Sequence, residues 1–199
     1  MITISVHAPF IQWGLDFIGE IHPHSSNQQR WILTATNYFT KWVEVIPVKN
    51  TTDIVVIKFL EENILSGFGC LQQILIDNAA AFSNVKMIEF CQKYSILLHH
   101  FTPYYPQGNG LEESSNKSLV KVIKKTLEDH KKSWDIHLIH AIWENRVSPK
   151  RSTVKSPFQL VYGKEEIFPT HLALPVMRFL QESYEKKMIS LEGLIKLLS

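Results

Sequence analysis

The chain has 199 residues, of which 45% are hydrophobic and 20% are charged, and its formal net charge is +2. These values are typical of one globular domain with a buried core, and they exclude a protein whose overall basic charge alone would indicate nucleic-acid binding. No apolar run is long enough to span a bilayer, and no charged-then-apolar leader opens the chain. We therefore expect a soluble, intracellular protein without a membrane partner.

Three strands are predicted in the first quarter of the chain, over residues 11–20, 30–39 and 41–48. Each range is rich in aromatic and β-branched residues, and turn formers follow the first one. The connection between the second and third ranges is very short, which favours antiparallel pairing. The sequence therefore predicts an antiparallel meander at the start of the fold.

Helices and strands alternate in the rest of the chain. Thr51-Thr52-Asp53 can cap a helix that continues to Leu65 and is ended by Gly67 and Gly69. The elements expected after it are a strand over 72–77, a helix over 80–93 with Phe82, Ile88 and Cys91 pointing inward, a strand over 95–101, a loop over 102–110, a long helix to about 131 and a helix over 133–147. This order predicts an α/β fold with a mixed sheet and helices on its faces.

The cysteines and histidines show no metal-binding pattern. Cys70 and Cys91 lie in apolar segments without a second thiol nearby, so we expect small buried side chains in a reducing compartment. The nine histidines, His99-His100 and the pair His137 and His140 among them, lack cysteine partners at zinc-binding spacing. No zinc is therefore expected, and the histidines are interpreted as surface or partly buried residues.

Three acidic residues stand out by their positions. Asp16 lies inside the first predicted strand, Asp77 ends the strand over 72–77, and Glu113 opens the long helix. Acids at such positions can converge at one edge of an α/β sheet. Their hard oxygen atoms suit Mg²⁺ or Mn²⁺. Two such ions about 3.5–4 Å apart are the arrangement that supports phosphodiester chemistry.

Each of these acids also has a structural explanation. Asp77 or Asn78 can cap the following helix, and Glu113 can form an i,i+4 pair with Lys117. Asp16 is harder to explain in this way, because aspartate is disfavoured within strands unless it faces water at a sheet edge. The residues alone leave these alternatives open.

The long helix has a basic face that begins with an acid. At about 100° per residue, Glu113, Lys117, Lys121 and Lys124 share roughly a quarter of the circumference, whereas Glu112 points toward the apolar side. Lysines in such a stripe can bind backbone phosphates while the carboxylate binds a metal ion beside them. The structural alternative is an ordinary solvated helix face.

Four segments, taken in order, carry a specific resemblance: WGLDFIG, ILTATNYFTKWVEVIPV, LIDNAAAF and YYPQGNGLEESSNKSL. Together they resemble the integrase catalytic core of LTR retrotransposons, especially the gypsy type, and of retroviruses. The segment SPFQLVYGKEEIFP over 156–169 resembles the region just beyond that core. Thirty-five residues separate Asp77 from Glu113, which is the spacing of the family's Asp-Asp-35-Glu motif and selects Glu113 over Glu112.

The resemblance implies an RNase H-like α/β fold with a mixed five-stranded sheet. It implies DNA integration by two-metal polynucleotidyl transfer, namely 3′-end processing and strand transfer, with Asp16, Asp77 and Glu113 as catalytic ligands of two Mg²⁺ or Mn²⁺ ions. The implied partners are the DNA ends of the element, target DNA and further copies of the chain, and the implied location is the nucleus. The implied DNA-binding residues are Asn109, Asn116, Lys117, Lys121 and Lys124.

The expected organisation is an N-terminal tail over 1–9, an integrase core-like domain over 10–170 and a helical linker or tail over 171–199. The sequence departs from the family pattern at Ala79, which replaces a glycine, at Glu112, which replaces a small residue, and at Asn37, where many relatives have aspartate. If position 79 needs a positive φ, alanine costs about 1 kcal/mol or more there.

The flanking modules common in integrases are not recognised, neither an N-terminal zinc module nor a C-terminal β-barrel. The alternative interpretation is therefore a non-catalytic relic or domesticated domain that binds nucleic acid or another protein. A hydrolytic RNase H-type nuclease has less support, because the 104–119 loop and the 156–169 segment are integrase-like.

Overall fold

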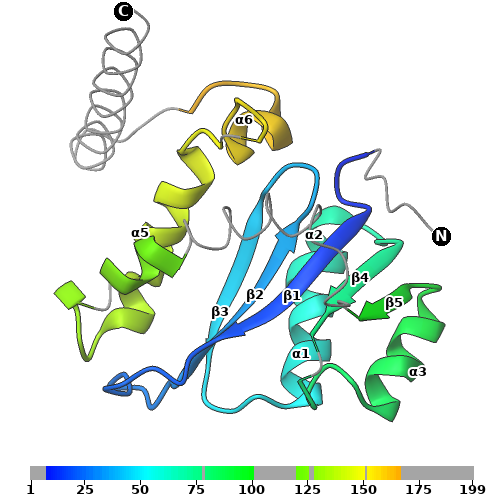
Figure 1. Ribbon diagram of the computed structural model, residues 1–199, viewed down its shortest axis with the longest axis horizontal. Coiled ribbons are helices and arrows are strands. Elements are labelled where there is room, and N and C mark those ends of the chain that lie inside the picture. Colours follow the sequence, from blue (N-terminus) through cyan, green and yellow to red (C-terminus); the bar gives the residue numbers. More distant parts are fainter. Residues whose placement is uncertain (1–7, 78, 101–119, 126–127, 151, 167–199) are drawn as a thin grey trace, which may run out of the picture. The chain divides into compact units, whose positions relative to one another are not determined.

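The computed structural model describes residues 8–77, 79–100, 120–125, 128–150 and 152–166 (Figure 1). Two compact units divide the chain, Met1–Gly163 and Lys164–Ser199, and the sheet and its helices belong to the first. Within the described ranges, no helix is both long enough and apolar enough to cross a membrane.

Five strands form one mixed sheet in the order β3-β2-β1-β4-β5. β1 pairs antiparallel with β2, and β2 pairs antiparallel with β3, as the predicted meander requires. β1 also pairs parallel with β4, and β4 pairs parallel with β5. The strands are β1 (Gln12–Ile18), β2 (Trp31–Asn37), β3 (Val43–Val48), β4 (Gln73–Ile76) and β5 (Leu97–His100). The predicted mixed five-stranded α/β architecture is confirmed.

Six helical elements have defined bounds: α1 (Asp53–Phe59), the π-helical η1 (Leu60–Leu65), α2 (Ser66–Phe68), α3 (Val85–Lys93), α5 (Trp134–Val147) and α6 (Pro157–Tyr162). Residues 120–125 and 128–129 are also helical and belong to the long helix predicted up to about 131. Its expected beginning lies outside the described residues. Figure 1 shows α5 beside β3, and α3 beside β5 on the other side of the sheet's central strand.

The two faces of the sheet pack against different helices. Neighbouring strand residues point to opposite faces. Leu33 of β2 accordingly joins the larger apolar cluster with Phe59 of α1 and Met87 of α3. The adjacent Ile32 joins a second cluster with Trp134 of α5. All five side chains are almost inaccessible to solvent, so both faces of the sheet are covered by helices.

The first helix begins where the sequence predicts. Thr52 is its N-cap, and the Thr52 hydroxyl accepts a hydrogen bond from the backbone N–H of Val55 at 3.4 Å. Helical structure continues through η1 and α2 and ends at Gly69, whose φ of 80° is in the left-handed region that favours glycine. Gly69 therefore ends the helical structure as predicted, whereas Gly67 lies within α2 and does not.

The next helix begins later than predicted. α3 begins at Val85 rather than at residue 80, because the Asn84 side chain accepts a hydrogen bond from the Met87 N–H at 3.1 Å and caps the helix there. Phe82 and Cys91 are buried as expected. Ile88, predicted to point inward, is 47% exposed.

The two cysteines have different environments. Cys91 is buried, and this burial raises the pKa of its thiol to about 11. Cys70 is exposed, so the prediction that both cysteines are buried is wrong for Cys70. Cys70 lies after Gly69, where the chain leaves the helix, and its side chain is therefore not held against the core.

Candidate active site

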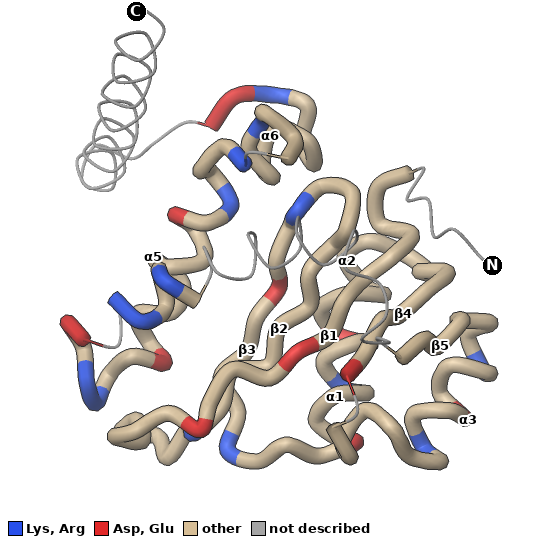
Figure 2. The backbone as a smooth tube through the Cα atoms, viewed as in Figure 1, with Lys and Arg blue, Asp and Glu red and all other residues tan. Residues whose placement is uncertain are grey.

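Asp16 and Asp77 lie opposite one another on adjacent central strands. The parallel register pairs Gly14 of β1 with Leu75 of β4. When this register is continued by two residues on each strand, Asp16 lies opposite Asp77, the residue that directly follows β4. Neighbouring strands are about 4.8 Å apart, so the two side chains emerge close together. Figure 2 shows acidic positions on β1 and just beyond β4 near one another.

The structure removes the simple explanation for Asp16. β1 is the middle strand of the sheet, with β2 on one side and β4 on the other, so Asp16 is not on an edge strand, although the residue is exposed near the end of β1. On the β2 side, the Asp16 carbonyl accepts a hydrogen bond from the Thr34 hydroxyl at 3.1 Å.

The structure also removes the capping explanation for Asp77. α3 is capped by Asn84, several residues further on. The Oδ1 atom of Asp77 instead accepts a hydrogen bond from the Ala79 N–H at 2.9 Å, which forms a local turn. The cost expected for alanine at position 79 remains a prediction, because the backbone angle there depends on residue 78, which lies outside the described residues.

Both desolvation and a neighbouring carboxylate affect the pKa of Asp16. The pKa of Asp16 is raised, first because surrounding protein atoms desolvate its carboxylate and second because the negative charge of Asp77 lies nearby. A hydrogen bond from the Phe17 backbone opposes this increase. Asp16 nevertheless keeps a solvent-exposed surface, and the packing around it is therefore only partial.

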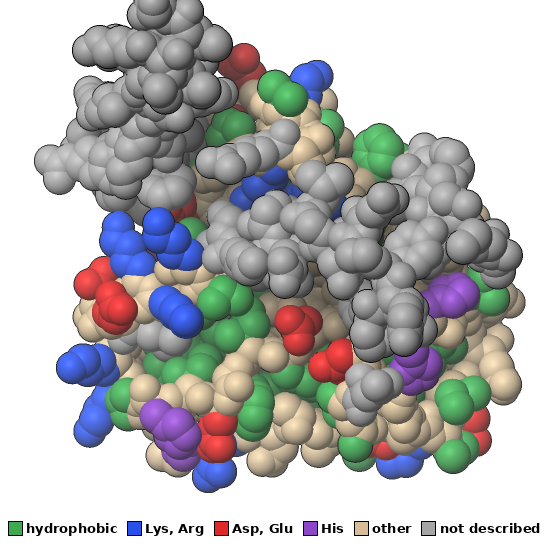
Figure 3. Space-filling view, in the orientation of Figure 1, with side chains coloured by type: hydrophobic (Ala, Val, Ile, Leu, Met, Phe, Trp, Pro, Cys, Tyr) green, Lys and Arg blue, Asp and Glu red, His purple; other side chains and the backbone are tan. Residues whose placement is uncertain are grey.

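The donor set fits a hard divalent cation. Within the described ranges, no lysine, arginine or histidine forms an ion pair with Asp16 or Asp77. Two adjacent carboxylates without a protein cation between them offer the oxygen ligands that Mg²⁺ and Mn²⁺ prefer. On the face shown in Figure 3, acidic side chains lie close together near the centre.

Aromatic packing fixes the strand ends that carry the two acids. The ring of Phe17, next to Asp16, stacks on the ring of Phe82 with centroids 4.8 Å apart and an interplanar angle of 14°. Phe82 is fully buried in the segment between β4 and α3. The stack therefore ties the end of β1 to the chain that follows Asp77.

Asn37, a departure from the family pattern, has a structural role. Its side chain is fully buried, and its Nδ2 donates a hydrogen bond to the Gln12 carbonyl at 3.1 Å. Its Oδ1 accepts hydrogen bonds from the backbone N–H and the hydroxyl of Thr40, both at 2.9 Å. Asn37 therefore fixes the turn between β2 and β3 and joins it to β1.

The other predicted site residues are only partly within the described ranges. Glu113, Asn109, Asn116 and Lys117 lie outside them, as does the loop that contains the glycines. Lys121 and Lys124 lie in the helical stretch 120–125, and both are exposed. Ile123 of the same stretch is 1% exposed and packs in the second apolar cluster, so this part of the helix has a buried side and a lysine-bearing side.

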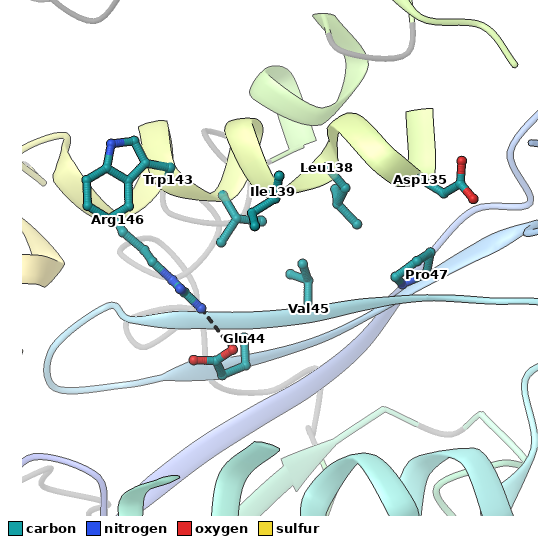
Figure 4. Close-up of a pocket in the computed structure, with 9 residues that line it drawn as sticks. Glu44, Val45, Pro47, Asp135, Leu138, Ile139, Trp143 and Arg146 are labelled. Atoms are coloured by element: carbon teal, nitrogen blue, oxygen red, sulfur yellow. Dashed lines mark ion pairs between the residues drawn. The ribbon is translucent and has the colours of Figure 1, made fainter. Parts of the chain in front are cut away.

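A separate hollow lies between β3 and α5 and has a volume of about 390 Å³ (Figure 4). An ion pair of 2.8 Å between Arg146 and Glu44 crosses from the helix to the strand. The guanidinium also donates two hydrogen bonds to the Val43 carbonyl and lies over the Trp42 ring at 4.1 Å. Burial lowers the pKa of Arg146, and Glu44 opposes that decrease. These contacts join α5 to the sheet, and neither Asp16 nor Asp77 lines this hollow.

A mixed five-stranded sheet with paired acids on its central strands defines an RNase H-like protein, and comparison with known proteins identifies the family. The Integrase core domain profile matches residues 6–106, which is just over half of the chain. The chain belongs to the Integrase core domain family and is homologous to the integrases of retroviral and retrotransposon Pol proteins.

Two curated relatives are polyproteins. The Gag-Pol polyprotein of Avian reticuloendotheliosis virus is 31% identical over 156 residues, covering 78% of this chain and 13% of the polyprotein. The Pol polyprotein from transposon 412 of Drosophila melanogaster is 24% identical over 170 residues, covering 85% of this chain and 14% of the polyprotein. The chain therefore spans only a small part of the relatives that it matches.

A solved structure has the same fold. The HTLV-2 integrase catalytic core domain, in complex with magnesium and in a trimeric form, superposes with a TM-score of 0.59 and 24% sequence identity. The match covers 76% of this chain and 96% of that domain. The similarity confirms the predicted RNase H-like fold.

Proposed function

We propose that this chain contains the catalytic core of a retroelement integrase, which trims DNA ends and joins them to target DNA. The observation that carries the proposal is the pair formed by Asp16 and Asp77. These carboxylates face one another on adjacent central strands of an integrase-core fold, and no described cationic side chain pairs with either.

In this proposal Asp16, Asp77 and Glu113 hold two Mg²⁺ or Mn²⁺ ions. When bound, such ions lower the pKa of an attacking water or hydroxyl group and stabilise the charge on the leaving oxygen of a phosphodiester. The Phe17–Phe82 stack and the turn between Asp77 and Ala79 keep the two aspartates in place. The magnesium complex of the HTLV-2 core supports this choice of metal by analogy.

In this proposal DNA binds to residues of the loop over 102–110 and to the lysine-bearing face of the predicted long helix. Lys121 and Lys124 are exposed and suit contacts with backbone phosphates, which position DNA without reading its sequence. Asn109, Asn116 and Lys117 complete the proposed interface by their correspondence to the family. The proposed substrates are the DNA ends of the element and target DNA.

The proposal also covers the type of retroelement, the oligomeric state, the domain bounds and the location of the protein. The resemblance of the four sequence segments supports a gypsy-type origin. The trimeric form of the HTLV-2 core supports a homo-oligomer, because joining two DNA ends requires more than one core. The proposed core domain extends over 10–170, between a tail over 1–9 and a helical linker or tail over 171–199, and acts on DNA in the nucleus.

The test is cleavage and joining of a branched DNA substrate in the presence of Mn²⁺. We expect the wild type to nick or join this substrate and Asp77→Asn to lose at least about a hundredfold in rate, because one metal ligand loses its charge. Asp129→Asn, which changes an exposed carboxylate outside the site, is the matched control and is expected to retain activity.

A wild-type protein without activity on any branched substrate would contradict the enzymatic proposal. It would favour the alternative of a relic or domesticated domain that binds nucleic acid or a partner. Equal activity of the wild type and Asp77→Asn would show that the cleavage does not depend on the proposed site.

A further inference from the structure

The connection from β1 to β2 brings one glutamate and two histidines together outside the proposed active site. We propose that Glu20, His22 and His24 form a binding site for a borderline divalent metal ion such as Zn²⁺. Each residue offers one ligand atom, and the three atoms lie within 4.8 Å of one another. Histidine and acidic side chains adjoin one another at the lower left of Figure 3.

The distances already approach those of a metal site. The His24 Nε2 and Glu20 Oε1 atoms are 3.1 Å apart, and the His22 Nε2 and Glu20 Oε2 atoms are 4.0 Å apart. In a tetrahedral zinc site with bonds of about 2.0–2.2 Å, ligand atoms lie roughly 3.3–3.5 Å from one another. Small side-chain rotations therefore suffice to surround an ion, and a fourth position remains open for water.

Burial and hydrogen bonds of neighbouring residues hold the backbone that carries these three side chains. Ile21 is buried, and its N–H donates a hydrogen bond to the Arg30 carbonyl at 2.7 Å. Ser25 is also buried, and its hydroxyl accepts hydrogen bonds from the N–H groups of Asn27 and Gln29. The buried Ile21 and Ser25 therefore hold the segment against the protein, while the more exposed residues at positions 20, 22 and 24 have their ligand atoms close together.

The ligand types select the class of metal ion. Two imidazole nitrogens and one carboxylate oxygen form a three-ligand set typical of Zn²⁺, and imidazole also suits Cu²⁺ and Ni²⁺. Mg²⁺ prefers oxygen ligands and is not expected here. The prediction of no zinc rests on the absence of cysteines at zinc-binding spacing from the histidines, whereas this site uses a glutamate and two histidines.

Arg30 is the competing cation. Its Nη1 atom lies 3.7 Å from the Glu20 Oε1 atom, and both side chains are substantially exposed. An exposed ion pair contributes little free energy, so a divalent ion with three ligands can displace it.

The experiment is a calorimetric titration of the 199-residue chain with Zn²⁺ in buffer containing excess Mg²⁺, which occupies the carboxylates of the proposed active site. We expect one Zn²⁺ per chain, and binding weaker by at least about tenfold in both His24→Gln and His22→Gln. The matched control is His130→Gln/His137→Gln, which removes two imidazoles whose centroids are 3.7 Å apart and is expected to bind like the wild type.

X-ray absorption at the zinc edge provides the second readout. Nitrogen and oxygen ligands without sulfur support the site, whereas a sulfur ligand would assign the bound zinc to a cysteine such as the exposed Cys70 and overturn the proposal. The proposal is also overturned if the wild type does not bind below millimolar Zn²⁺, or if His22→Gln and His24→Gln bind as tightly as the wild type. Direct binding is preferred to a thermal shift, because the short segment can also bind zinc when the chain is unfolded.

Discussion

Lys150 illustrates how one buried side chain can make the stability of the protein depend on pH. It is 7% exposed, and its Nζ atom has no hydrogen-bond partner within the described residues. Burial lowers its pKa from 10.5 to about 8, and the nearby charge of Glu144 only partly opposes this effect. The pKa of Glu144 is itself raised, chiefly by burial. The native fold therefore favours the neutral form of Lys150.

This environment predicts that stability increases with pH in the alkaline range. Between pH of about 8 and 10.5 the unfolded chain binds a proton at Lys150 that the folded chain has released, so raising the pH stabilises the fold. Below about pH 8 both states are protonated, and the fold carries the full cost of the buried charge. Lys150→Met, which cannot titrate, removes this contribution.

Urea unfolding at several pH values between 7.5 and 10.5 tests the prediction. The wild type should gain up to about 3 kcal/mol in unfolding free energy relative to Lys150→Met across this range. Lys155→Met, which changes an exposed lysine nearby, is the control and should follow the wild type. Parallel pH profiles for the wild type and Lys150→Met would show that Lys150 titrates normally in the fold.

At the scale of whole elements, the sequence predicts the strands well because they have clear local signals. Runs of aromatic and β-branched residues bounded by turn formers locate β1 and β2 to within two residues at each end. The start of α3 was missed because several residues before it can cap a helix. Asn84 caps it, while Asp77 bonds to Ala79.

The candidate site was predicted in part for a similar reason. The strand positions of Asp16 and Asp77 follow from the pattern of elements, whereas the strand order that places β1 beside β4 is shown only by the folded structure. The pair formed by Glu44 and Arg146 could not be predicted, because the two residues are far apart in sequence and meet only when α5 packs on β3. The grouping of Glu20, His22 and His24 was visible as alternate residues in one segment, but only the folded backbone shows that they converge.

Capping of α3 gives a prediction at the scale of one helix. Asn84→Ala removes the hydrogen bond from the Met87 N–H and the two bonds that the Asn84 amide donates to the Ala80 and Ala81 carbonyls. We expect the free energy of unfolding to decrease by about 1 kcal/mol. Chemical denaturation followed by circular dichroism measures this change.

The neighbouring Ser83→Ala is the matched control, because Ser83 is exposed and its side chain makes only long contacts of 3.3–3.4 Å with His100. Its stability should remain within about 0.5 kcal/mol of the wild type. A loss for Ser83→Ala as large as that for Asn84→Ala would place the helix start elsewhere.

At the scale of the whole molecule, the sheet consists of two halves that meet at the candidate site. β1, β2 and β3 are antiparallel, whereas β1, β4 and β5 are parallel. Asp16 lies on the strand common to both halves, and Asp77 follows its parallel neighbour. A metal ion held by both residues would link β1 to β4 and stabilise the native fold in proportion to its binding free energy.

The most direct test of this account is a calorimetric titration of Mn²⁺ into the wild type, Asp16→Asn and the control Asp53→Asn, whose side chain instead pairs with Lys86. We predict that the wild type and Asp53→Asn bind Mn²⁺ at millimolar concentrations or below, and that Asp16→Asn binds at least about tenfold more weakly. Mn²⁺ binding to Asp16→Asn as tight as to the wild type, or no binding to the wild type in the millimolar range, would contradict the proposal that Asp16 and Asp77 form a metal site.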